Sequence, residues 1–265
     1  MGVQIVSIFW ETSKKAMFRM KNVKERRKPW QTALLMHGTA TGPPFLILML
    51  LDVLFPSFMD LKESFPWLIH YYMMEVPMLL ISILMIRQLS KGNFGNYGFN
   101  LRSKDLKLAF SVVGGIVFAL FMALIDYLPP IVLGRFEIGY DLTFTNVLGT
   151  LSFMWIFVGI AEETLSRGLI QTYLMNNISG DVKIASWNIK RATILGGAIF
   201  GLSHLFNIYR KPLEFVIPQM IYATIFGIIV GYVYQETQSL AGPIVMHNVA
   251  DGLETTIKYL LYLSS

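Results

Sequence analysis

The sequence contains no cysteine, and this absence excludes several kinds of chemistry. No disulfide, thiolate zinc site or thiol nucleophile can form within these 265 residues. Charged residues are also scarce, at 15% of the chain, whereas an average soluble domain has about 25%. Because so few charges cannot cover a soluble protein of this length, the composition indicates a membrane protein.

Hydrophobic residues make up 54% of the chain, and its mean hydropathy is +0.53. They gather in runs close to the ~20 residues that a helix needs to cross a bilayer core of ~30 Å. The sequence therefore predicts an all-α, polytopic transmembrane helical bundle of about seven spans (seven or eight) with its active centre inside the bundle. We expect one membrane domain over residues 1–265, with no internal repeat. The spans are expected near residues 33–55, 67–89, 106–128, 144–175, 192–208, 213–234 and 240–263.

The net charge of +5 is concentrated near the N-terminus, where residues 14–28 hold eight basic residues and one acid, Glu25. Next to a hydrophobic span, this pattern favours a cytoplasmic juxtamembrane segment (residues 1–32) that contacts anionic membrane lipids, over a nucleic-acid site. The loops after the second and fourth spans are also basic, so the positive-inside rule predicts a cytoplasmic N-terminus. Arg210 and Lys211 run against this orientation. Short loops favour a prokaryotic cytoplasmic membrane, with the endoplasmic reticulum as the alternative.

Two adjacent acids lie in the middle of the fourth predicted span, where a charge costs a few kcal/mol or more and usually marks function. Glu163 and Arg167 are four residues apart on one helix face, so we expect an ion pair between them. Glu162 points about 100° away and has no partner on its own helix. An unpaired buried carboxylate is suited to proton transfer. The alternative is a purely structural charge network. Glu75 is a further acid within a span, without a neighbouring partner in the sequence.

Two other spans carry polar motifs. Phe200 and His204 share a face of the fifth span, and His247 and Asp251 share a face of the seventh. Each motif alone could be an ordinary interhelical hydrogen bond. At about 1.5 Å per residue, however, Glu162, His204 and the His247–Asp251 pair reach overlapping depths. We therefore expect these three helices to form one shared cavity.

The three motifs, in this order within residues 145–255, resemble the CAAX protease and bacteriocin-processing (CPBP) family of intramembrane proteases. This family includes the prenyl-protein endopeptidases and the bacterial Abi proteins. The resemblance rests on Glu162-Glu163-x-x-x-Arg167, Phe200-x-x-x-His204 and His247-x-x-x-Asp251. It implies an endopeptidase that cuts near the C-terminus of a protein, with or without a prenyl group, or cuts a membrane-associated peptide. The cavity would open towards the cytoplasm.

The resemblance also implies roles for these residues. Glu162 and His204 would activate the attacking water, and Glu163, paired with Arg167, would support the site. His247 and residue 251 would stabilise the tetrahedral oxyanion, with Phe200 and Asn248 as supporting residues.

One position departs from the family pattern, because the prenyl endopeptidases are expected to have Asn where this chain has Asp251. An ionised aspartate cannot donate a hydrogen bond to an oxyanion, whereas a protonated one can, and so can Asn248 if it faces the site. Two histidines and several carboxylates also suit zinc. We favour the metal-free mechanism on family grounds and keep a zinc-dependent version of the same protease as the alternative. The zinc ligands would then be Glu162, His204, His247 and Asp251.

Two other functions remain open at this point. One is a non-catalytic bacteriocin-immunity or scaffold membrane protein, against which the intact motifs argue. The other is a proton-coupled transporter, against which the lack of repeated halves argues. The sequence identifies neither the physiological substrate nor the oligomeric state.

Overall fold

The structure is a computed structural model that describes residues 28–55, 58, 61, 64–101, 107–209 and 211–264. The basic segment before Lys28 lies outside the described residues. So do parts of the charged loops between the first two spans and between the second and third.

Long helices dominate the described part of the chain, and they agree with the predicted all-α bundle. The helical segments are α2 (Pro29–Leu54), η1 and α4 (Trp67–Leu89), α5 (Leu108–Val132), α6 to α8 (Phe144–Asn177), α9 and η5 (Arg191–Tyr209), α10 (Leu213–Thr237) and α11 (Ala241–Ser264). Shorter elements are the 3₁₀ turn η2 (Phe94–Tyr97) and the strands β1 (Asp181–Ile184) and β2 (Trp187–Lys190).

Within the described residues, six of these segments are long and apolar enough to cross a membrane. The exception is α11, the seventh predicted span, because its inner part carries Asp251, Glu254 and Lys258. These side chains line a cavity of the bundle, so the polar composition of α11 reflects what it faces. The chain is an integral, multi-pass membrane protein.

The hairpin of β1 and β2 was not predicted. It lies in the loop between the fourth and fifth spans, and Ile184 pairs with Trp187 across a two-residue turn. Ala185 in this turn adopts a left-handed backbone conformation, with φ of 53°, as such tight turns require. Most of the hairpin is exposed.

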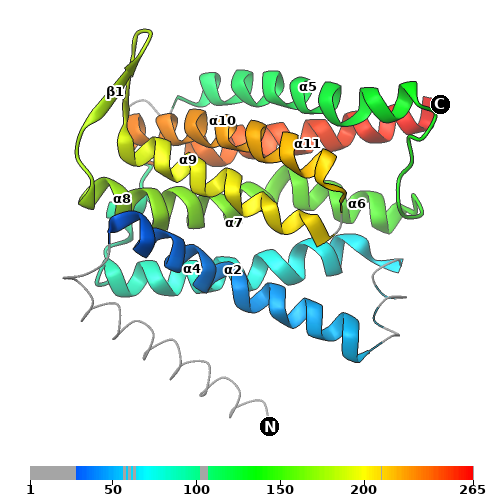
Figure 1. Cartoon of the computed structure of the whole chain (residues 1–265), viewed down its shortest axis with the longest axis horizontal. Helices are drawn as coiled ribbons and strands as arrows, with labels where there is room; N and C mark the ends of the chain where they lie inside the picture. Colours follow the sequence, from blue (N-terminus) through cyan, green and yellow to red (C-terminus); the bar gives the residue numbers. More distant parts are fainter. Residues whose placement is uncertain are drawn as a thin grey trace.

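The helices run side by side along the longest axis of the molecule, with the hairpin at one end and the C-terminus at the other (Figure 1). We call these the hairpin end and the C-terminal end. Since consecutive segments alternate in direction, α2, α5, α9 and α11 all begin at the hairpin end. Helix α11 packs mainly against α5, and α10 packs against α9.

Glycines permit these close helix contacts. A Cβ added at Gly115 of α5 would lie 2.7 Å from the backbone oxygen of Met246 on α11. A Cβ added at Gly227 of α10 would lie 3.0 Å from Cα of Gly197 on α9. The helices that carry the polar motifs are thus held at backbone contact distance.

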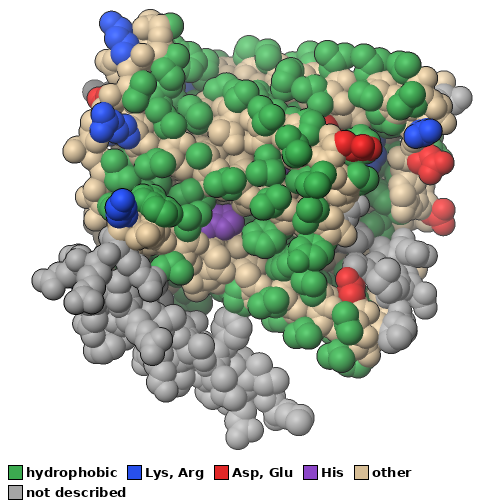
Figure 2. Space-filling model, in the orientation of Figure 1, with side chains coloured by type: hydrophobic (Ala, Val, Ile, Leu, Met, Phe, Trp, Pro, Cys, Tyr) green, Lys and Arg blue, Asp and Glu red, His purple; other side chains and the backbone are tan. Residues whose placement is uncertain are grey.

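The surface of the bundle is apolar around its middle. Hydrophobic side chains cover much of the face in Figure 2, with most Lys and Arg at the hairpin end and most Asp and Glu at the C-terminal end. On α5, for example, Val117 is 60% exposed and Leu124 is 59% exposed. An apolar belt between two polar ends is the surface expected in contact with lipid.

Candidate active site

The two adjacent glutamates lie at the end of α7 (Val158–Glu163), where the α-helix gives way to the π-helical segment η4 (Thr164–Gln171). The predicted ion pair is present: Nε of Arg167 lies 3.1 Å from Oε2 of Glu163, and Nη1 donates to Oε1 over 3.2 Å. All residues of η4 are buried. Short π-helical segments often occur at functional sites, and here one follows directly after the acidic pair.

Arg167 is almost completely buried, and its charge has three kinds of partner. Besides Glu163, its Nη2 donates to the backbone oxygen of Gly227 over 2.8 Å. Its guanidinium also lies 4.8 Å from the centre of the Phe200 ring. A buried charge is tolerated when such partners replace water. Arg167 therefore connects η4, α9 and α10 beneath the site.

His247 joins α11 to the acidic pair. Its Nδ1 lies 2.6 Å from Oε1 of Glu163. Its other ring nitrogen, Nε2, lies 3.4 Å from Oδ2 of Asp251 and 3.9 Å from Oε2 of Glu162. One imidazole is thus surrounded by three carboxylates, with Glu163 on one side of the ring and Asp251 and Glu162 on the other.

His204 lies at the point where α9 (Arg191–Ser203) changes into the 3₁₀ segment η5 (His204–Tyr209). Its Nδ1 lies 3.0 Å from the backbone oxygen of Phe200, which fixes the orientation of the ring. The Phe200 ring lies 5.2 Å from the His204 ring and 5.9 Å from the His247 ring. Phe200 therefore packs between the two histidines.

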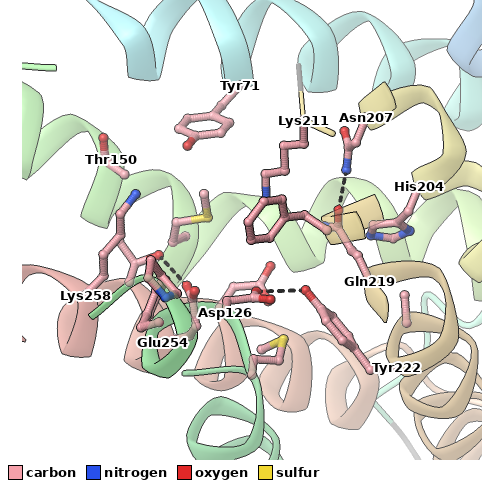
Figure 3. A pocket seen from close by; sticks show the side chains of 18 of the residues that line it. Tyr71, Asp126, Thr150, His204, Asn207, Lys211, Gln219, Tyr222, Glu254 and Lys258 are labelled. Carbon is pink, nitrogen blue, oxygen red and sulfur yellow. Dashed lines mark hydrogen bonds between the residues drawn. The ribbon is translucent and has the colours of Figure 1, made fainter. Parts of the chain in front are cut away.

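One cavity of about 830 Å³ brings the motifs together, since Glu162, His204, His247 and Asp251 all line it. Its size falls within the range of about 300–1,000 Å³ that is usual for ligand sites. Glu163 and Arg167 are not among its lining residues and lie behind His247. Figure 3 shows further polar side chains in the cavity: Asp126, which accepts a hydrogen bond from Tyr222; Asn207, which donates to Gln219; and Lys211, Glu254 and Lys258.

The larger cavity extends to the C-terminal end of the bundle. The loop between α5 and α6 contributes Arg135 and Glu137 to its lining, and both are exposed. The N-terminus of α2 lies at the opposite end. If the start of α2 lies on the cytoplasmic side of the membrane, the mouth of this cavity lies on the opposite side, whereas both were expected from the sequence to face the cytoplasm.

Asn248 does not line this cavity. Its Oδ1 accepts a hydrogen bond of 2.8 Å from the backbone of Gly159, and its Nδ2 donates over 3.0 Å to the backbone oxygen of Ile156. It ties α11 to the helix that carries the acidic pair. The structure therefore gives no support to Asn248 as the oxyanion donor.

Glu75 is a residue to which the sequence assigned no role. It lies on α4 and lines a second cavity of about 300 Å³, together with His37, Glu162 and His204. Its Oε2 is buried and has no hydrogen-bond partner among the described residues. The signal for it was an acid within a hydrophobic span, the same signal that identified Glu162. Asp126, Glu254 and Lys258 in the larger cavity could have been found in the same way.

The described residues offer no group of three or more His, Cys, Asp or Glu side chains placed to hold a metal ion. Nδ1 of His247 is engaged by Glu163, which leaves one ring nitrogen of that histidine facing the cavity.

Residues 144–253 match a family model described as Type II CAAX prenyl endopeptidase Rce1-like. The matched segment runs from the start of α6 into α11 and includes all the motif residues described above. Comparisons with curated proteins and with solved structures gave no match. Residues 144–253 of the chain are thus similar to the Rce1-like family of CAAX proteases.

Proposed function

We propose that the protein is an intramembrane endopeptidase that hydrolyses a peptide bond with water activated by Glu162 and His204. One observation carries the proposal: these two side chains face the same cavity as His247 and Asp251, within a segment that matches a protease family model. The remaining residues of the site fit the needs of amide hydrolysis.

In the first step, the Glu162 carboxylate takes a proton from a water that His204 orients. The water oxygen then forms a bond to the carbonyl carbon of the substrate, and the carbonyl electron pair moves to its oxygen. General base catalysis of this kind contributes about 10²–10⁴-fold to a rate. Glu162 has no ion pair on its own helix, and its carboxylate lines the cavity 3.9 Å from Nε2 of His247, where it can act as the base.

His247 is placed to stabilise the oxyanion that forms. Its Nδ1 faces Glu163 and its Nε2 faces the cavity. For both nitrogens to donate, the ring must be an imidazolium, and the carboxylates of Glu163 and Asp251 stabilise that form. In this arrangement the Asp251 carboxylate stabilises the positive charge of the His247 ring and fixes the orientation of that ring. An N–H of His247 donates a hydrogen bond to the oxyanion.

In the last step, the protonated Glu162 gives its proton to the leaving nitrogen as the carbon–nitrogen bond breaks. The electron pair of that bond leaves with the nitrogen, and the carbonyl re-forms as a carboxylic acid. One water is consumed, and Glu162 returns to its carboxylate form. No other reactant is needed.

The substrate is a protein or peptide that reaches a site inside the membrane. A CAAX tail with or without a prenyl group and a membrane-associated peptide both meet this description. The family match supports the class of reaction, and a cleavage assay compares these substrates.

The experiment uses purified protein in detergent with a quenched fluorogenic peptide that carries a farnesylated CAAX end, and with a panel of unprenylated peptides. We expect Glu162→Ala and His204→Ala to lower kcat by about 10³-fold. The matched control is Glu214→Ala, because Glu214 is exposed at the start of α10. If folded wild-type protein cleaves none of these peptides, the non-catalytic immunity or scaffold function becomes the better explanation.

A further inference from the structure

The two ends of the bundle differ in charge. At the hairpin end, the connecting segments carry Arg87, Lys91, Lys183, Lys190 and Arg191, and Lys28 and Lys107 directly precede α2 and α5. The described acids there are Asp181 and Glu236. At the C-terminal end, the described charges of the connecting segments and of the adjoining helix ends are two basic residues, Arg135 and Lys211, and four acids, Asp52, Glu137, Asp141 and Glu214. Figure 2 shows the same separation.

Short loops rich in Lys and Arg remain on the cytoplasmic side of a membrane, and this bias sets the orientation of the whole bundle. The hairpin end is therefore the cytoplasmic end. In the sequence, Arg210 and Lys211 counted against this orientation, and Arg210 lies outside the described residues. Lys211 is described. In the structure, its side chain lies in the larger cavity (Figure 3), where it faces other protein groups. Because the cavity accounts for the position of Lys211, we give this residue little weight when the basic residues of the loops at the two ends are compared.

The larger cavity reaches solvent at the other end. Its lining includes Arg135, Glu137 and Lys211, all in the loops of the C-terminal end. None of its described lining residues belongs to the loops of the hairpin end. From this mouth, the cavity leads inward to Glu162 and His204.

We infer that the larger cavity opens on the non-cytoplasmic face and that the substrate is a peptide segment exposed on that face. This inference rests on the proposed function. The chemical class of substrate is an exported peptide, or the non-cytoplasmic segment of a membrane-anchored protein. A prenylated tail that stays in the cytoplasm would meet the basic hairpin end of the bundle and would not meet the mouth of the cavity.

The absence of cysteine makes the orientation directly measurable, because a single introduced cysteine is the only thiol to be labelled. Three variants mark three places: Glu137→Cys at the mouth, Thr255→Cys inside the larger cavity and Ser186→Cys in the hairpin turn. Cells that produce each variant are treated with a small, charged methanethiosulfonate that does not cross membranes. The reagent reacts with the thiolate, which forms where water is present.

We expect Glu137→Cys and Thr255→Cys to be labelled in intact cells, and Ser186→Cys only after permeabilisation. The reverse pattern would overturn the inference. So would a Thr255→Cys thiol that reacts only after permeabilisation, since the cavity would then communicate with the cytoplasm.

Cleavage by sealed vesicles separates this inference from the proposed function. A quenched peptide with several Asp residues is added to right-side-out and to inverted vesicles. Because such charges keep the peptide from crossing a bilayer, we expect cleavage to be at least about tenfold faster with right-side-out vesicles. Faster cleavage by inverted vesicles would refute the outward opening and leave the protease in place. If peptide panels are cleaved in neither preparation nor in detergent, the proposed function fails, and the assignment of a substrate class fails with it.

Discussion

Oε1 of Glu163 lies 2.6 Å from Nδ1 of His247, and the two residues are 84 positions apart in the sequence. This contact, together with the ion pair between Glu163 and Arg167, forms a buried chain of three charged or chargeable groups, of which His247 lines the cavity and the other two lie behind it. Because Glu163 is fully buried, water cannot substitute for either partner. The orientation of the His247 ring therefore depends on a carboxylate and a cation that do not themselves line the cavity.

Removing one member of the buried ion pair should cost more stability than removing both. Arg167→Met leaves the Glu163 carboxylate buried without its cation, and we expect a loss of about 3–5 kcal/mol. The double variant Glu163→Gln with Arg167→Met carries no charge at either position, so its thermal unfolding temperature should recover towards that of the wild type. Its kcat should stay about 100-fold low, because His247 has lost its carboxylate partner.

Two quantities are measured. One is the thermal unfolding temperature, monitored by tryptophan fluorescence, and the other is the rate of cleavage of the quenched peptide. Arg87→Met is the matched control, because Arg87 is an exposed arginine at the end of α4, and we expect it to alter neither quantity. A double variant with full activity would show that the Glu163–His247 contact has no part in the reaction.

Position 251 tests how the oxyanion is stabilised. We expect Asp251→Asn to retain most of the activity, because an amide at this position can itself donate a hydrogen bond. Asp251→Ala leaves neither a carboxylate beside His247 nor an amide that could donate to the oxyanion, so its kcat should fall by about 10²–10³-fold. Steady-state kinetics on the two variants decide the point. Equal loss in Asp251→Asn and Asp251→Ala would mean that the negative charge beside His247 is essential.

Peptide cleavage should continue in the presence of excess 1,10-phenanthroline. Zinc sites need three or four ligand atoms at about 2.0–2.3 Å from the metal. Nδ1 of His247 is engaged by Glu163, and the three motif helices offer no suitable group of ligands among the described residues. The assay is run with and without chelator, followed by added zinc. Activity lost on chelation and restored by zinc would establish the zinc-dependent version of the protease.

The positions of the helices could be predicted from the sequence because the thickness of the bilayer sets the length of each apolar run. The predicted span at residues 67–89 matches Trp67–Leu89, and the predicted span at 240–263 differs from α11 by one residue at each end. The Glu163–Arg167 pair was equally predictable, since helix geometry alone brings residues four apart together. Both features depend on local sequence.

Contacts between helices could not be predicted in this way, because they depend on how each helix is rotated about its axis. His247 and Asn248 are adjacent in the sequence, yet one faces the cavity and the other binds the backbone of Gly159. A rotation of about 100° per residue separates them. The neighbours of Glu75 were hidden for the same reason, since they lie on other helices. The hairpin after the fourth span is too short and exposed to leave a clear pattern.

Close packing of α9 against α10 should be necessary to hold His204 in place. A Cβ added at Gly201 would overlap Oγ1 of Thr224 and lie 2.7 Å from the backbone oxygen of Met220. The side chain of Thr224 can rotate, but the backbone oxygen cannot move without shifting α10. We therefore expect Gly201→Ala to cost about 1–3 kcal/mol and to lower the unfolding temperature by about 3–10 °C.

The shift should also reach the site, because Gly201 is three residues before His204 on the same segment. We expect Gly201→Ala to lower kcat even at temperatures where the protein is fully folded. Gly38→Ala on α2 is the matched control, because a Cβ there meets nothing within 4 Å, and alanine favours a helix over glycine. Its unfolding temperature should stay the same or rise. If Gly201→Ala behaves like Gly38→Ala in both measurements, α9 and α10 are not packed at backbone contact, and the position of His204 must be held by other contacts.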